Sequence, residues 1–108
     1  MAYTPTFTLP EPSSEQVQAL HGWTLLEFGT DWCPHCQGAQ GAIRDALASL
    51  PDVQHIKIED GPGRRLGRAY RVKLWPTLVL LHNGQEAGRT IRPRTTAEVQ
   101  ELLAPAQT

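Results

Sequence analysis

The sequence predicts a single α/β domain over residues 1–108, in which helices flank a mixed central β-sheet on both faces. Three observations carry this prediction. Segments with helical spacing of apolar residues alternate with short apolar runs that suit buried strands. The chain is long enough to bury one core and too short for two. The pair Asn83-Gly84, which favours a two-residue hairpin turn, separates the last two strand-like segments.

The chain begins with a polar, proline-containing lead-in segment, residues 1–14, which we expect to be a loop and in part poorly ordered. Either Ser13 or Ser14 is expected to cap a short helix over 15–20, because a serine hydroxyl accepts a hydrogen bond from the free N–H groups of a first helical turn. The apolar run WTLLEF at 23–28 suits a strand that is covered on both faces.

The spacing of apolar residues predicts a longer helix after this strand. Between positions 37 and 50 they recur with a period of about 3.6 residues, and Pro51 ends the pattern. These residues are Ala39, Ala42, Ile43, Ala46, Leu47 and Leu50. The segment VQHIKIE at 53–59 predicts a second strand, and the turn sequence DGPG follows it.

The next part of the chain predicts a short cationic element and a hairpin. The stretch RRLGRAYRV at 64–72 is expected to form a short helix or turn. PTLVLLH at 76–82 is predicted to be a buried strand, and QEAGRTI at 85–91 its antiparallel partner across the Asn-Gly turn.

The final segment predicts a helix that is capped by Thr95 or Thr96 and reaches Leu103. The elements thus follow the order helix, strand, helix, strand, helix, strand, strand, helix. A strand–helix–strand unit followed by a hairpin and a closing helix produces a mixed sheet with helices on both faces.

Positive charge is concentrated in one part of the chain. The net charge of −1 indicates no particular class of partner, but the stretch 64–94 holds eight of the ten Lys and Arg residues and a single acidic residue, and so carries +7. The eight are Arg64, Arg65, Arg68, Arg71, Lys73, Arg89, Arg92 and Arg94. Neither the GxxxxGK[ST] spacing of a phosphate loop nor an aromatic-studded basic motif is present, so we expect no nucleic-acid partner.

No segment predicts export or insertion into a membrane. The start of the chain lacks a basic region followed by an apolar core, and no apolar run approaches the ~18 residues that span a bilayer. We therefore expect a cytoplasmic location and no membrane partner. In such a reducing compartment, two cysteines are more often catalytic or metal-binding than structural.

Both cysteines lie three residues apart in the motif DWCPHCQ, at Cys33 and Cys36. A zinc site normally needs four ligands, and the histidines at 21, 55 and 82 are scattered over separate predicted elements. A structural disulfide over so short a spacing would close a tiny loop and restrain little of the unfolded chain. The placement of the pair favours a redox role, and we expect neither a metal nor a cofactor.

The position of Cys33 explains this preference. It follows a buried strand and stands where a helix is expected to begin, with Pro34 in the first turn, where proline is tolerated. The free N–H groups and the positive end of the helix dipole stabilise a thiolate, which lowers the pKa of Cys33 and makes it nucleophilic. Cys36, one turn into the helix, is expected to be shielded and less acidic, as a resolving thiol should be.

Two stretches of this sequence, LLEFGTDWCPHC and WPTLVLLHNGQ, resemble the thioredoxin superfamily, and the resemblance runs from about Trp23 to Leu103. It implies a thioredoxin fold and thiol–disulfide exchange, with Cys33 as attacking thiol and Cys36 as resolving thiol. We expect a monomer that exchanges disulfides with proteins or with glutathione. A thioredoxin reductase or glutathione would supply the electrons.

The resemblance implies roles for residues around the pair. Pro76 would follow a cis peptide bond and pack beside Cys33, while the backbone of Trp75 pairs with an extended substrate. Together with these two residues, Trp32 and Pro34 would shape the substrate contact. Glu27, the one charge inside WTLLEF, matches a buried acidic residue that acts as a proton acceptor for the resolving cysteine. The alternative is that Glu27 lies at a strand edge and reaches solvent.

His35 is expected to set the redox potential. Pro-His between the cysteines is the dipeptide of a strongly oxidising branch of the superfamily, whereas thioredoxin proper has Gly-Pro. An imidazole that donates a hydrogen bond or a positive charge to the thiolate of Cys33 stabilises the reduced form, so the disulfide becomes a stronger oxidant. We therefore predict a pair more oxidising than thioredoxin. The alternative is that the His35 side chain points into solvent and has little effect.

The sequence also departs from the family pattern. Gly29 replaces a large aromatic residue, which predicts a thinner wall near the site, and Gly41 replaces a helix-kinking proline. Trp75 is larger than the usual aliphatic residue, Arg92 takes the place of a glycine on the docking surface, and His55 stands where a lysine lies near the buried acid. For His55, a partly buried strand histidine with one hydrogen bond is an equally good interpretation.

Lys73 and Arg92 come from the two loops expected to flank Cys33, with Arg71 close by. A positive rim there would attract acidic polypeptides or glutathione, although a solvated basic face without a function is also common. Two other functions remain open. One is glutaredoxin-like reduction of glutathione mixed disulfides, which needs only Cys33. The other is a non-catalytic module whose disulfide switches the binding of a partner.

Overall fold

A computed structural model describes residues 2–107, that is, all but the first and last residues of the chain. Its strands form one mixed sheet in the order β2-β1-β3-β4. The strands are β1 (Trp23–Gly29), β2 (Gln54–Glu59), β3 (Thr77–His82) and β4 (Gln85–Ile91). The β1–β2 pair is parallel, and the β1–β3 and β3–β4 pairs are antiparallel. The predicted mixed sheet is confirmed.

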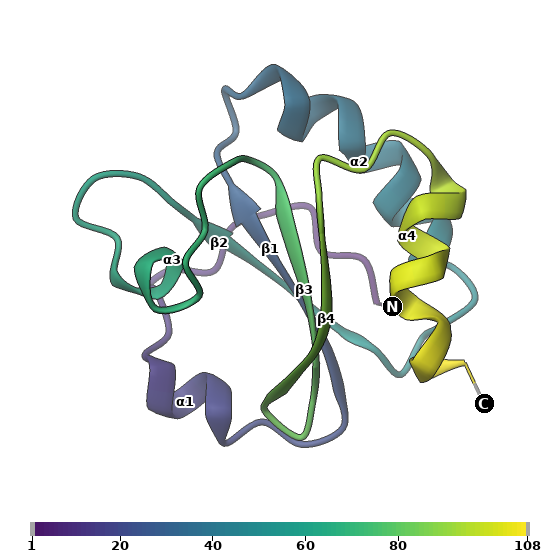
Figure 1. Ribbon diagram of the computed structural model, residues 1–108, viewed down its shortest axis with the longest axis horizontal. Helices are drawn as coiled ribbons and strands as arrows, with labels where there is room; N and C mark the ends of the chain where they lie inside the picture. Colours follow the sequence, from purple (N-terminus) through teal and green to yellow (C-terminus); the bar gives the residue numbers. More distant parts are fainter. Residues whose placement is uncertain (1, 108) are drawn as a thin grey trace.

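Helices cover both faces of the sheet. They are α1 (Ser14–Gln18), α2 (Pro34–Leu47), α3 (Arg65–Ala69) and α4 (Thr96–Leu103), with a 3₁₀ turn at Ala104–Ala106. Figure 1 shows α2 and α4 on one side of the strands and α1 and α3 on the other. The order of elements is the one that the sequence predicts.

Two apolar cores result from this layering, because successive residues of a strand face opposite sides. Leu25 of β1 belongs to the core under α2 and α4, together with Ile43 and Leu103. Its neighbour Leu26 belongs to the core under α1 and α3, together with Leu66. The central strands therefore read as continuous apolar runs rather than alternating ones.

The helix boundaries follow local chemistry. Ser13 is the N-cap of α1, and its hydroxyl and the Gln16 side chain form a reciprocal capping box. α2 ends at Leu47 and not at Leu50, where the apolar pattern stops. The reason is Pro51, which disfavours helical dihedrals at the residue before it. Leu50 still packs against the core, in a turn instead of a helix.

The Asn83-Gly84 turn lies where the sequence predicts it. Both residues have positive φ, at 51° and 80°, as a type I′ hairpin turn requires. A Cβ on Gly84 would lie 2.0 Å from the backbone oxygen of Gln18, the last residue of α1. Glycine is therefore needed here both for the turn and for its close contact with the end of α1.

The lead-in segment runs beside the outer edge of β2. Phe7 forms a parallel bridge with Lys57, and the Thr8 N–H donates to the Lys57 carbonyl oxygen at 2.9 Å. Further back, Ala2 is buried in the core under α2 and α4. The edge of the sheet that β2 presents is thus partly covered by the beginning of the chain.

Candidate active site

Cys33 and Cys36 lie just after the end of β1, at the start of α2. The strand ends at Gly29, and Cys33 is the N-cap residue of α2, with extended backbone dihedrals (φ −79°, ψ 122°). Pro34 is the first helical residue, where its missing N–H costs nothing. Both thiols are free and buried, with exposed fractions of 5% and 3%. The start of α2 lies beyond the arrowhead of β1 in Figure 1.

The surroundings of Cys33 favour its thiolate. Burial works against the charged form, but hydrogen bonds from the Cys36 N–H, the Cys36 thiol and the His35 N–H, together with the charge of Arg92, hold the pKa of Cys33 below its ordinary value. The two N–H groups are free donors of the first helical turn. It is thus the backbone of His35 that contacts the sulfur, while its side chain is exposed.

The surroundings of Cys36, in contrast, disfavour its thiolate. Burial, the hydrogen bond to Cys33 and the negative charges of Cys33 and Glu27 raise the pKa of Cys36 to about 12, against an N–H donor from Thr30. Its sulfur occupies the space that a side chain at Gly29 would fill, since a Cβ there would lie 2.5 Å from Sγ. The thinner wall expected at Gly29 is therefore filled by the second cysteine.

The aromatic residues form an edge beside the pair. The Trp75–Pro76 peptide bond is cis, and Pro76 is buried. The Trp75 indole N–H donates to the Asp60 carboxylate at 2.8 Å, which fixes the ring. Trp32, with 67% of its surface exposed, meets the Trp75 ring edge-on at a centroid distance of 5.7 Å. Two tryptophans thus flank the cysteines, one anchored and one open to solvent.

Arg92 is held at the same edge by its backbone and its side chain. Its N–H donates to the Pro76 carbonyl at 2.9 Å, and its Nε donates to the Trp75 carbonyl at 2.9 Å. Its φ of 52° is strained for a residue with a side chain. Lys73 lies exposed on the loop before β3.

A groove of about 430 Å³ adjoins the start of α2. It is lined by Pro34, His35, Gly38, Ile91, Arg92, Pro93 and Arg94. Three of these residues, His35, Arg92 and Arg94, have basic side chains. The groove therefore places basic side chains beside the start of α2, where Cys33 lies.

Glu27 lies beneath the cysteines in a buried polar network. It is 2% exposed and stands in β1, between β2 and β3, so it does not reach solvent at a strand edge. His55 Nε2 lies 2.9 Å from its Oε1, and Gln40 Nε2 donates to its Oε2 at 2.7 Å. Both carboxylate oxygens therefore have a partner, as a buried charge requires.

Sequence reasoning missed several members of this network. Gln40, one turn after Cys36, donates to the Cys36 carbonyl at 2.8 Å as well as to Glu27. Lys57 is buried and donates to Gln40 Oε1 at 3.1 Å. The signal was present for Lys57, which alternates with His55 on one face of an otherwise apolar strand. Nothing local distinguishes Gln40 from the other polar residues of α2.

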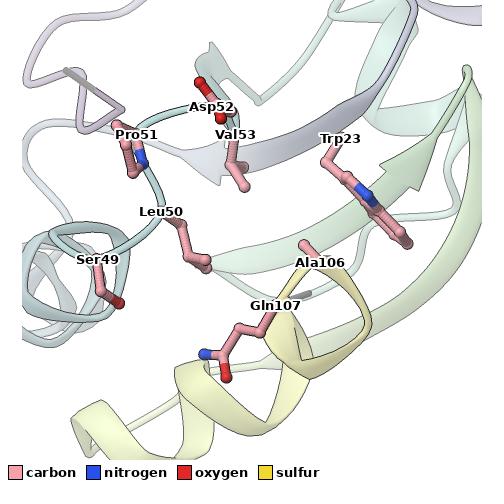
Figure 2. A pocket seen from close by; sticks show the side chains of 8 residues that line it. All are labelled: Trp23, Ser49, Leu50, Pro51, Asp52, Val53, Ala106 and Gln107. Atoms are coloured by element: carbon pink, nitrogen blue, oxygen red, sulfur yellow. The ribbon is translucent and has the colours of Figure 1, made fainter.

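A hollow larger than the groove at the start of α2 lies away from the cysteines. It measures about 590 Å³ and is lined by Trp23, Ser49, Leu50, Pro51, Asp52, Val53, Ala106 and Gln107. As Figure 2 shows, Trp23 forms one wall and the turn after α2 the other. Trp23 begins β1, whereas the cysteines follow its other end, so volume does not mark the candidate site.

Within residues 2–107, no cluster of three or more His, Cys, Asp or Glu side chains has the arrangement of a metal site. Over the same residues, each helix is too short or too polar to cross a bilayer.

Comparison with known proteins finds similarity to thioredoxins in both sequence and structure. A Chlamydia trachomatis thioredoxin is 27% identical over 86 residues, which are 80% of this chain and 84% of that protein. Rice thioredoxin H2-1 is 27% identical over 67 residues, and the match covers 62% of this chain but only 49% of the rice protein. Reduced thioredoxin 2 from Pseudomonas aeruginosa superposes with a TM-score of 0.84 at 44% identity, over 95% of this chain and 96% of that one.

The thioredoxin fold that the sequence predicts is confirmed by this superposition and by the family match below. Thioredoxins are thiol–disulfide oxidoreductases, which supports the same general kind of activity here. The family model named thioredoxin matches residues 6–105, nearly the whole chain, and the protein belongs to the thioredoxin family.

Proposed function

We propose that this protein exchanges disulfides with protein substrates through Cys33 and Cys36 and that its pair is more oxidising than that of thioredoxin. The observation that carries the proposal is the opposite acidity of two adjacent sulfurs. The pKa of Cys33 is lowered at the helix start, while that of Cys36 is raised to about 12. Such a pair has one thiolate that can attack a substrate disulfide and one thiol that can later resolve the mixed disulfide.

The reaction proceeds in two displacements. The Cys33 thiolate attacks one sulfur of a substrate disulfide, so that a mixed disulfide forms and the other substrate sulfur leaves as a thiolate. Cys36 then gives up its proton and attacks Cys33 Sγ. The second substrate sulfur leaves, and the protein holds a Cys33–Cys36 disulfide. Run in reverse, the same steps donate a disulfide to a substrate.

The expected potential follows from the stability of the thiolate. Each interaction that stabilises the reduced form of Cys33 makes the disulfide a stronger oxidant, and ~30 mV corresponds to ~1.4 kcal/mol for two electrons. The N–H groups of His35 and Cys36 and the charge of Arg92 act in this direction. We attribute a further contribution to the imidazole of His35, which lies at the groove beside Cys33.

Substrate contacts follow from the same surface. Trp32, Trp75 and Pro76 would hold an extended polypeptide beside Cys33, and Arg92 and Lys73 would favour acidic substrates. Arg92 Nε already donates to the Trp75 carbonyl, so a substrate N–H would pair with the second lone pair of that oxygen or replace the arginine. A thioredoxin reductase or glutathione in a reducing compartment such as the cytoplasm would supply electrons.

A redox titration against glutathione, combined with an insulin-reduction assay, tests the proposal. We expect a two-electron couple above the ≈ −270 mV of thioredoxin, insulin reduction by the wild type, and none by Cys33→Ser. A potential at or below that of thioredoxin would refute the stronger oxidising power. A pair that titrates normally while insulin stays intact would indicate a redox-switched binding module instead.

The cationic groove gives a second candidate function a specific basis. His35, Arg92 and Arg94 line it beside Cys33, and the carboxylates of glutathione need cationic partners. A glutaredoxin-like activity on glutathione mixed disulfides requires Cys33 alone. The variant Cys36→Ser would keep that activity and lose insulin reduction, whereas loss of both would exclude the glutaredoxin-like reaction.

A further inference from the structure

The first residues of the chain reach the polar network beneath the cysteines. We define the N-terminal strap as residues 2–8, the part of the lead-in segment that runs beside β2. The Thr4 N–H donates to His55 Nδ1 at 2.8 Å, and the Tyr3 ring stacks on the imidazole at a centroid distance of 5.4 Å. The Tyr3 hydroxyl donates to Gln40 Oε1 at 2.7 Å. The strap thus contacts both partners of Glu27.

The hydrogen bond from Thr4 determines which nitrogen of His55 carries the proton. A backbone amide can only donate, so Nδ1 must present its lone pair and cannot bear a hydrogen. A neutral ring then carries its hydrogen on Nε2, which faces Glu27 Oε1 at 2.9 Å. The contact is consequently a donation from His55 to a carboxylate. A doubly protonated ring would point an N–H at the Thr4 N–H, so the strap also disfavours the imidazolium form.

The direction of the hydrogen bond to the other oxygen of Glu27, Oε2, is also determined by its neighbours. Gln40 Oε1 accepts from the Tyr3 hydroxyl and from Lys57 Nζ, so the amide nitrogen must face the opposite way. That nitrogen donates to Glu27 Oε2 and to the Cys36 carbonyl. Both partners of the carboxylate are therefore donors, an arrangement that stabilises a negative charge, and each oxygen keeps a further lone pair that can take a proton.

We propose that the N-terminal strap belongs to the catalytic apparatus: the Thr4 N–H fixes His55 as a neutral Nε2–H donor, and His55 in turn holds Glu27 as the anion that accepts the proton of Cys36. His55 and Thr4 are positioning residues in this proposal. It rests on the proposed function, because it specifies how the resolving step of that reaction is assisted.

The step balances as follows. In the mixed disulfide, the proton on Cys36 Sγ passes to the Glu27 carboxylate, and the Cys36 sulfur forms a bond to Cys33 Sγ. The bond between Cys33 and the substrate sulfur breaks, and its electron pair leaves with the substrate as a thiolate. Glu27 then passes its proton to that thiolate or to solvent, and the carboxylate with its two donors is restored.

The charged and titratable groups that face the His55–Glu27 pair come from three elements. The strap supplies Tyr3, β2 supplies Lys57, and α2 supplies Cys36 and, next to Tyr3, Arg44. The buried Lys57 ammonium is held on Gln40 and on the carbonyl of the strap residue Pro5 at 3.2 Å. The positive charge of Lys57 therefore stabilises a negative charge on Glu27, as the hydrogen bond from His55 does.

The tautomer of His55 can be observed directly in the wild-type protein. Long-range ¹H–¹⁵N NMR correlations distinguish a protonated from an unprotonated ring nitrogen. We expect Nε2 to carry the hydrogen and Nδ1 to be bare in the reduced protein at neutral pH. A hydrogen on Nδ1, or a doubly protonated ring at that pH, would overturn the proposal without reference to any activity.

The kinetic test separates the two sulfurs in one trace. Reduced protein mixed with Ellman's reagent releases one coloured thiolate when Cys33 attacks and a second when Cys36 resolves the mixed disulfide. His55→Leu should slow the second release about tenfold, because a hydrogen bond to a charged group is lost, and leave the first release unchanged. His55→Gln keeps a donor and should recover most of the rate. Equal rates for Leu and Gln would overturn the positioning role.

The strap is tested with a matched pair of variants. Thr4→Pro removes the N–H that His55 accepts, while Thr4→Val keeps it and removes only the hydroxyl. With the N–H gone the ring can take a second proton, so the second release by Thr4→Pro should become slower and newly pH-dependent between about pH 5 and 8, the range in which histidine titrates. Thr4→Val should keep the shape of the wild-type pH profile, because it keeps the N–H that donates to His55. Identical pH profiles for both variants would overturn the proposal.

Failure of the inference and failure of the proposed function give different results. If wild-type protein releases both thiolates but the variants behave like it, only the roles of His55 and the strap are refuted. If the wild type releases one thiolate and never resolves, the dithiol function itself is refuted and the inference with it. Urea unfolding of each variant identifies any that lose rate because they lose structure.

Discussion

At the scale of single residues, Gly29 and Cys36 share one small volume, and this sharing determines what position 29 can hold. A Cβ at Gly29 would lie 2.5 Å from Cys36 Sγ and 3.6 Å from Cys36 Cβ. We predict that Gly29→Ala lowers the stability of the reduced protein by about 1–3 kcal/mol, as overpacking of a filled core does. Urea denaturation under reducing conditions measures the change.

Gly38→Ala is the matched control for that substitution. Gly38 lies within α2, and a Cβ there would meet nothing within 4 Å. Alanine should therefore stabilise the protein by about 0.5–1 kcal/mol, because it lowers the entropic cost of forming the helix. If both alanine variants shift stability in the same direction, the packing argument at Gly29 is wrong.

The two sulfurs should also differ in reactivity. Because the pKa of Cys33 is lowered and that of Cys36 is raised to about 12, iodoacetamide should modify Cys33 alone at neutral pH. Its rate should rise with pH to a plateau whose midpoint lies below that of free cysteine, since only the thiolate reacts. Peptide mass spectrometry after timed alkylation identifies the site. Modification of Cys36 first would contradict the assignment of the attacking sulfur.

The charge of Arg92 is one cause of that lowered pKa, so the arginine can be tested separately. Arg92→Gln should move the alkylation midpoint of Cys33 upward and slow the reaction at neutral pH, because a positive charge no longer favours the thiolate. The control is Lys73→Gln, which removes an exposed charge of the same sign. Equal shifts in both variants would indicate a general effect of net charge rather than a local one.

At the scale of elements, the start of α4 has a single side-chain cap. The Thr95 hydroxyl accepts a hydrogen bond from the Glu98 N–H at 3.2 Å, whereas Thr96 is already the first helical residue. We predict that Thr95→Ala costs about 1 kcal/mol of stability, as loss of an N-cap usually does. Thr96→Ala should cost less. Urea unfolding of both variants decides the question, and equal costs would contradict the cap.

The elements also differ in how far their ends could be predicted. Strands and helices whose apolar residues recur with a clear period appear in the predicted order. The reason is that burial of one or both faces of an element sets the spacing of apolar residues along it. The end of α2 could not be read from the same pattern. Leu50 continues the apolar period but belongs to a turn, since the core accepts an apolar side chain from either kind of backbone.

At the scale of the whole molecule, the concentration of positive charge between residues 64 and 94 should affect encounter rates. Arg92 and Arg94 bring part of this charge to the groove beside Cys33. We predict that reduction of glutathione disulfide, an anion, slows a few-fold as ionic strength rises from about 0.01 M to 0.15 M, where the screening length falls from about 30 Å to 8 Å. Stopped-flow measurements over a salt series give the rates.

Cystamine, a cationic disulfide, is the control for this electrostatic effect. Its reduction should become faster as salt screens the repulsion from the same groove. If the rates for both disulfides respond alike to salt, the charge near Cys33 does not steer substrates.

The sequence by itself determined the order of the elements, the Asn83-Gly84 hairpin turn and the placement of Cys33 at a helix start, because each of these depends on residues close together in the chain. It also singled out Glu27, a lone charge in an apolar strand. Only the tertiary structure decided what surrounds that charge. His55, Gln40 and Thr4 come from three separate segments, and hydrogen bonds between them depend on side-chain directions that no local pattern records. The same holds for Gly29, whose need to be small comes from a sulfur seven residues away in the chain and in direct contact in the fold.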